Sequence, residues 1–195
     1  MGVTYTNAKG VTYHLCRGTT KTGKERFFFA REECAEPVEE LPAGYVISES
    51  VNGVVSLARD RPSAILPEEV AAVEQAVRRH PKSGNYRVRK KQNLIEIYER
   101  VGPSADLVME LMGKIGMAPR AIPPGLAETL DRQARYSPVL RFRLEDRARR
   151  MYRAERMCYL GSIDDFIELG VTGTAAELAR RLVPKLGTDD FYELW

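Results

Sequence analysis

The sequence predicts an α+β fold, with antiparallel β-hairpins in the N-terminal half and a mixed, more helical second half that contains a further strand pair. Three observations support this class. Aromatic and β-branched runs flank glycine-bearing turns within residues 1–60, as in a β-meander. Pro67-Glu68-Glu69 starts a stretch whose apolar residues recur at helical spacing. Residues 139–144 alternate apolar and basic side chains, as a half-buried strand does.

Residues 1–101 form the β-rich part of this prediction. Asn52-Gly53 lies between two apolar runs and is the strongest short-range signal for a hairpin. The expected elements, in chain order, are three short strands within 4–31, a loop over 34–42, a hairpin of 44–49 with 54–58, a helix from Pro67 to near His80-Pro81, and a third hairpin that joins the basic run 86–91 to the more apolar run 94–99.

Residues 102–124 are rich in glycine, proline and methionine. We interpret them as a hinge or linker with a short helix over 105–115, between a β-rich region of 1–101 and an α+β region of 125–195. A single compact domain is the alternative. In either case, 195 residues are enough to bury a hydrophobic core without disulfides or metals.

The region from residue 125 onward begins with a predicted helix over 126–135 and a strand over 139–144. Residues 146–159 fit either a helix or a second strand after a turn, and we favour the hairpin. In the strand, apolar and basic side chains would point to opposite faces of the sheet. The apolar set is Leu140, Phe142 and Leu144, and the basic set is Arg141 and Arg143.

Capping patterns predict the remaining helices. Ser162 followed by Asp165, with Gly170 as a stop, predicts a short helix over 163–169. Later elements follow the same logic: Thr174 with Glu177 opens a helix to about Leu186-Gly187, and Thr188 opens a final turn with Phe191 and Tyr192.

Composition narrows the class of protein. Cys16, Cys34 and Cys158 are odd in number and widely spaced, so we expect reduced, mostly buried thiols, no disulfide framework and no metal or other cofactor. No apolar run approaches the roughly 20 residues of a membrane-spanning helix, and the start MGVTYTNAKG lacks the apolar region of a signal peptide. We therefore expect a cytoplasmic protein with no membrane partner.

Charge is unevenly distributed although the net charge is only +3. Residues 77–100 carry eight basic and two acidic side chains, and residues 131–156 carry nine arginines against four acids. Residues 37–76 and 160–195 are each acidic, with seven acidic side chains against two and three basic ones. Such blocks either meet each other across a domain or subunit contact, or present the basic part to a polyanion.

Short pieces of the sequence invite comparison with known proteins. They are Tyr5-Thr6-Asn7, Lys9-Gly10, Tyr13, Lys21-Thr22-Gly23-Lys24, Arg26-Phe27-Phe28-Phe29 and Gly161-Ser162-Ile163-Asp164-Asp165. In these pieces, about a quarter of the chain, the sequence resembles a family of uncharacterised bacterial hypothetical proteins. Because no activity is attached to that family, the resemblance implies no site and no mechanism.

The basic hairpin faces are the candidate functional residues. Arginine binds phosphate in a bidentate manner, and a basic strand face fits a nucleic-acid backbone, although it can equally face only water. We predict a non-enzymatic bacterial protein, without catalytic residues, that binds nucleic acid or another polyanion. The residues predicted to bind are Lys21, Lys24, Arg26, Arg87, Arg89, Lys91, Arg141, Arg143 and Arg150.

Two other functions compete with this one. The first is a protein-interaction module, or a self-assembling homo-oligomer, in which the basic and acidic blocks meet. The second, with less support, is a hydrolase with an acidic metal site, for which Asp164, Asp165 and Glu168 are the nearest carboxylates.

Overall fold

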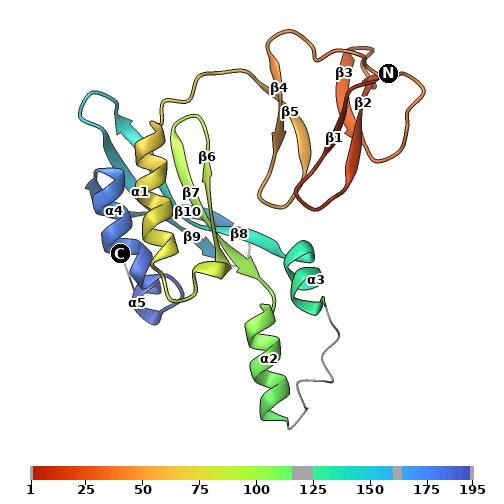
Figure 1. Cartoon of the computed structure of the whole chain (residues 1–195). Helices are drawn as coiled ribbons and strands as arrows, with labels where there is room; N and C mark the ends of the chain where they lie inside the picture. Colours follow the sequence, from red (N-terminus) through yellow and green to blue (C-terminus); the bar gives the residue numbers. More distant parts are fainter. Residues whose placement is uncertain (1, 116–124, 160–163, 194–195) are drawn as a thin grey trace. The chain divides into compact units, whose positions relative to one another are not determined.

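The computed structural model describes residues 2–115, 125–159 and 164–193, and its fold is α+β (Figure 1). The contacts divide the chain into two compact units, Met1–Arg61 and Pro62–Trp195. The segment predicted as a hinge, 102–124, therefore lies within the second unit. No helix in the described ranges is long and apolar enough to cross a membrane.

The first unit consists of two antiparallel sheets, as its hairpin signals predicted. β1 (Thr4–Thr6), β2 (Thr12–Thr19) and β3 (Glu25–Ala30) form a meander in that order. β4 (Tyr45–Glu49) and β5 (Val55–Arg59) form the hairpin around Asn52-Gly53. Gly53 adopts a φ of +78°, a backbone conformation that residues with a Cβ rarely adopt.

A disulfide joins Cys16 to Cys34 in this unit, so the prediction of reduced thiols is wrong for both. Cys16 lies on β2, and the chain returns from β3 to run beside it. Backbone hydrogen bonds from Arg17 to Glu36 and from Val38 to Leu15 align the returning segment with β2. This pairing places the two cysteines 6.1 Å apart between Cα atoms, which their separation of 18 residues does not reveal. Cys158 is a free thiol.

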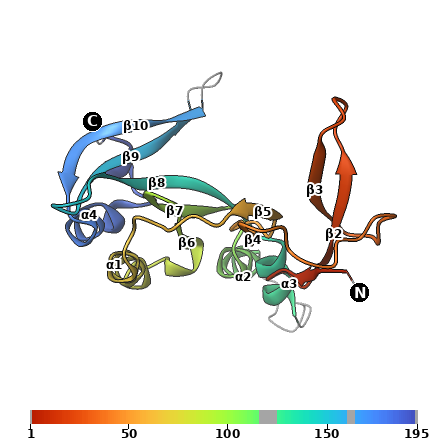
Figure 2. The same cartoon turned by 90° about the horizontal axis from the view of Figure 1, so that it is seen from above.

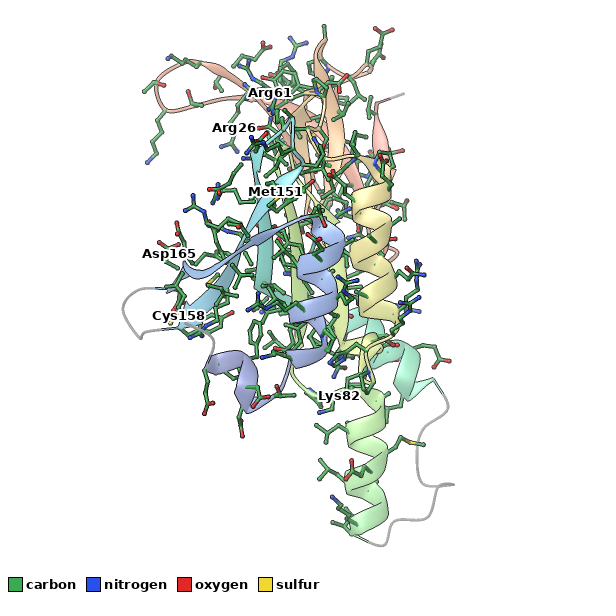
Figure 3. The ribbon with its side chains drawn as sticks, turned by 90° about the vertical axis from the view of Figure 1, so that its left-hand side faces the viewer. Arg26, Arg61, Lys82, Met151, Cys158 and Asp165 are labelled. Atoms are coloured by element: carbon green, nitrogen blue, oxygen red, sulfur yellow. A yellow bond between two sulfur atoms is a disulfide. The ribbon has the colours of Figure 1, made fainter. Side chains whose placement is uncertain are left out.

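The second unit is built on a five-stranded antiparallel sheet in the order β10-β9-β8-β7-β6. Its strands confirm the basic hairpin, the alternating strand and the choice of a hairpin over a helix for residues 146–159. Their bounds are Tyr86–Lys90 for β6, Leu94–Val101 for β7, Arg135–Asp146 for β8, Met151–Tyr159 for β9 and Asp164–Gly173 for β10. In Figure 3, Met151 at the start of β9 lies above Lys82, which follows α1 in sequence.

Helices α1 (Pro67–Arg78) and α4 (Ala175–Leu182) cover one face of this sheet (Figure 2). The sheet's inward side chains and the helices form one core, which includes Ile97, Leu140 and Phe142. Thr174 and Glu177 form the predicted capping box of α4. Shorter elements follow α1 and α4: the 3-10 turns η1 (Ser83–Asn85) and η3 (Val183–Lys185), and the terminal helix α5 (Asp189–Tyr192).

The helices α2 (Ala105–Lys114) and α3 (Leu126–Gln133) connect β7 to β8 (Figure 1). Both were predicted. β7 and β8 are neighbours in the sheet, so the two helices belong to the connection between two adjacent strands. Residues 116–124, between the helices, lie outside the described residues. Arg100 on β7 anchors α3 by hydrogen bonds to Asp131 and to the carbonyl of Leu130.

The predicted helix over 163–169 is wrong, because residues 164–173 form strand β10. Asp165 pairs with Cys158 on β9, and both are labelled in Figure 3. Leu169 points into the core at 2% exposure, which a strand at the sheet edge allows. Gly170, predicted to end a helix, instead adopts a φ of +63° where the register with β9 shifts. Ser162, the predicted cap, lies outside the described residues.

Candidate nucleic-acid interface

Arg141 and Arg143 lie on β8, on the sheet face opposite the core. Their apolar neighbours Leu140 and Phe142 are fully buried, which confirms the predicted alternation. Both guanidinium groups bind the same carboxylate, Glu155 on β9, with Arg143 Nε at 3.0 Å from Glu155 Oε1. Arg141 also lies over the ring of Phe166, 3.7 Å from its centroid. A single negative charge is thus shared by two positive ones.

Arg150, in the turn between β8 and β9, binds an acid far away in the sequence. Its guanidinium donates to both carboxylate oxygens of Glu69 in the first turn of α1 and to the carbonyl of Ala64, at 3.0 Å. Arg153 on β9 similarly binds Glu145 and Glu168. The arginine-rich block therefore meets acidic side chains of the same unit.

The acids in these contacts are held in their charged form. Burial by itself would raise the pKa of Glu155, but hydrogen bonds from Arg143 and Arg141 outweigh burial and lower it. The pKa of Glu69 is lowered for the same reason, since hydrogen bonds from Arg150 and Tyr152 outweigh its desolvation. These arginines and carboxylates therefore stabilise one another within the fold.

The predicted cations of β6 are in a different position, at the edge of the sheet. Arg89 is exposed, and no hydrogen bond or ion pair is found for it in the described part of the chain. Arg87 is exposed, donates to the carbonyls of Gly84 and Tyr86, and lies 5.0 Å from the ring centroid of Tyr136. Lys91, just beyond β6, binds the buried Glu96 at 2.7 Å.

A cleft of about 420 Å³ separates this edge from α1. We call it the β6 cleft; it is lined by Glu74, Val77, Arg78, Ser83, Gly84, Tyr86, Arg87 and Val88. Two arginines thus line it against one acid. The Tyr86 hydroxyl points away from solvent and donates to Glu99 at 2.9 Å, and burial together with Glu99 raises the pKa of Tyr86.

Two further cations follow α1, outside the lining of the β6 cleft. Arg79 and Lys82 follow α1 in sequence and are exposed. Among the residues that the structure describes, no ion pair is found for Arg78, Arg79 or Lys82. These residues belong to the basic block 77–100 of the sequence, whereas the η1 turn at Ser83-Gly84, which forms one end of the cleft, was not predicted. The stretch Pro81-Lys82-Ser83-Gly84, which follows the helix, is the sequence signal that could have predicted this turn.

The remaining predicted residues belong to the first unit. Lys21 and Lys24 are exposed in the turn between β2 and β3, and Arg26 lies 4.8 Å from the ring centroid of Phe28. They form a loose cationic tip and are not part of the β6 cleft.

Comparison of the chain with protein-family models, curated proteins and solved structures found no match. The carboxylates proposed for metal binding do not gather: Glu168 binds Arg153, and within the described ranges no group of three or more His, Cys, Asp or Glu side chains is arranged to hold a metal ion.

Proposed function

We propose that this protein binds nucleic acid through the β6 cleft and the cations around it, without catalysing a reaction. The observation that carries the proposal is a difference between two sets of arginines. Arg141, Arg143 and Arg150 bind carboxylates of their own unit. Arg78 and Arg89, at the cleft and the strand beside it, have no such partner among the described residues. Their charge is available to an external anion.

Phosphate groups suit these side chains. A guanidinium presents paired N–H donors that match two phosphate oxygens, and the Ser83 hydroxyl adds a further donor at the end of the cleft. Such contacts reach the nucleic-acid backbone and not the base edges, so we expect weak dependence on nucleotide sequence. The predicted residues on β8 and in the β8–β9 turn have less support as contacts, because Arg150 is paired with Glu69, and Arg141 and Arg143 both bind Glu155.

Salt dependence tests the proposal most directly. We expect the wild-type chain to shift labelled single-stranded and duplex oligonucleotides at low salt, with affinity falling linearly in a log–log plot against salt concentration. Arg78→Ala and Arg89→Ala should each weaken binding to all sequences similarly and reduce that slope by about 1. Arg147→Ala is the matched control, since Arg147 is an exposed arginine of the β8–β9 turn and belongs to neither α1 nor β6.

Absence of binding at low salt would exclude the proposal, and equal losses from Arg147→Ala and Arg89→Ala would show only nonspecific attraction. The alternative, a module in which acidic and basic blocks meet between molecules, has weaker support because these blocks meet within the second unit. The bacterial origin and cytoplasmic location stay predictions. The Cys16–Cys34 bond bears on location, since disulfides persist mainly in oxidising compartments.

A further inference from the structure

Exposed apolar side chains are concentrated on α2. Leu107, Met109, Leu111 and Ile115, on or just after this helix, have exposed fractions of 45, 49, 51 and 72%. Scattered exposed apolar residues are normal on a protein surface, but a contiguous set on one element indicates an interaction site. The helix extends away from the sheet and packs mainly against α3 (Figure 1).

Helical spacing orders three of these residues into one stripe, whereas Met109, two residues from Leu111, lies on the opposite side of the helix. Leu107, Leu111 and Ile115 are four residues apart, so they lie one above the other on the same side of the helix. Val108 and Met112 lie beside this stripe and are only half-buried. Within the described residues, α3 covers part of the apolar surface of α2 and leaves the stripe open.

One edge of the stripe carries a pair of opposite charges. Glu110 and Lys114 are both exposed and lie 2.6 Å apart, between Lys114 Nζ and Glu110 Oε1. When a helix pairs with an antiparallel copy of itself, the same edge of each copy meets, and the residue order is reversed. Glu110 of one copy then approaches Lys114 of the other on both sides of the symmetry axis.

We propose that the stripe Leu107–Leu111–Ile115 is a docking surface for a second copy of this chain, with two α2 helices antiparallel about a twofold axis near Leu111. Leu107 then packs against Ile115 of the second copy, and Leu111 against Leu111. A copy of the same helix supplies both the apolar stripe and the reversed charges, which a generic apolar partner does not. The inference is independent of nucleic-acid binding.

Sedimentation of the full chain tests the apolar part. We expect a concentration-dependent dimer for the wild type. Leu111→Glu should weaken the dimer by about 100-fold or more, because it buries a charge in the interface. Leu111 is half-exposed in the isolated chain, so this variant should keep its circular dichroism and melting temperature. Glu68→Lys, on the exposed start of α1, is the control and should leave the dimer unchanged.

Charge swapping tests the orientation. In Glu110→Lys every edge pair is Lys–Lys, and in Lys114→Glu every pair is Glu–Glu, so each variant should dimerise about tenfold more weakly. Mixing the two variants in equal amounts should restore a heterodimer, since Lys now meets Glu at both positions. Loss of an intrahelical ion pair alone would not be repaired by mixing.

Several results would overturn the inference. The wild-type chain could stay monomeric at all accessible concentrations, or Leu111→Glu could leave the dimer intact. The mixture of Glu110→Lys and Lys114→Glu could also sediment like the separate proteins. Binding of the monomer to lipid vesicles that is abolished by Leu111→Glu would assign the stripe to a membrane surface and would also exclude the dimer.

Discussion

The two units of this chain stabilise their sheets by different means. In Met1–Arg61 the buried apolar side chains are few: Leu15, Cys16, Val38 and Val55. In Pro62–Trp195 a continuous core joins five strands to α1 and α4. The first unit compensates with the Cys16–Cys34 disulfide and with buried polar contacts. A unit of this size rarely buries enough apolar surface to be stable without such additions.

Charged side chains without an ion-pair partner also differ in position between parts of the second unit. The second unit has carboxylates placed across its sheet and at the start of α1, and these bind Arg141 and Arg143 of β8 and Arg150 of the β8–β9 turn. No further strand of the described residues pairs with β6 at this edge, so β6 has a neighbouring strand, β7, on one side only. Cations at a sheet edge also discourage pairing with other chains.

The largest effect should come from the core of the second unit. Phe142→Ala removes a fully buried ring between β7 and β9, and we expect it to lower the free energy of unfolding by about 3–5 kcal/mol. Calorimetry should show this loss in the transition of the second unit and none in that of the first. A shift of both transitions would show that the units unfold together, and it would contradict the claim that each unit is stabilised by its own means.

Reduction of the disulfide should have the next largest effect, and in the first unit. The bond closes a loop with a sequence separation of 18, so breaking it should cost about 3 kcal/mol through the entropy of the unfolded chain. Melting with and without dithiothreitol measures this. Cys158→Ala, which removes the free thiol, should leave the difference between the two conditions unchanged. No difference on reduction would contradict the role given to the disulfide.

Asn7 should contribute somewhat less to the same unit. Its side chain is 5% exposed, donates to the carbonyl of Gly53 at 2.7 Å and accepts from the backbone N–H groups of Lys9 and Val11. Asn7→Ala leaves these groups without their partner, and we expect a loss of about 2 kcal/mol. Denaturant unfolding of the first unit measures it. An unchanged midpoint would mean that water replaces the amide at no cost.

The smallest effect should be the acid response of the second unit. A carboxyl whose pKa is lowered by folding stabilises the fold above its ordinary pKa of 4.5, and this contribution is lost as the pH falls toward the lowered value. Lowering the pKa of one carboxyl by 1 stabilises the folded state by about 1.4 kcal/mol at most. We therefore expect the melting temperature of this unit to fall below pH 4.5, and Glu155→Gln to flatten that fall. An equally steep fall in the variant would exclude Glu155 as its source.

Secondary structure was predictable wherever local pattern and tertiary position agree. Alternation in β8 and the Asn52-Gly53 turn predicted their elements correctly, because side-chain burial and turn geometry are local properties. The helix predicted over 163–169 was wrong, since acidic residues followed by a glycine fit the capping pattern of a helix but can also be accommodated in a strand. Pairing of 164–168 with β9 decided between them, and a pattern within ten or so residues does not contain that information.

The candidate site was predictable in part. The sequence identified Arg87 and Arg89 as candidates within the basic block 77–100, because basic residues are close together along that part of the chain. It could not separate them from Arg141, Arg143 and Arg150, which looked equally available. Their partners are contributed by other elements, and Glu69 is 81 residues from Arg150.

The amino-acid order by itself determined the α+β class, the hairpins and the helix starts, because these depend on side-chain periodicity and on hydrogen bonds within a few residues. Tertiary structure alone decided which cysteines are joined, that residues 164–173 extend the sheet, and which arginines keep an unshared charge. Each of these outcomes depends on the distance between residues that are far apart in the chain, and only the packed sheet sets that distance.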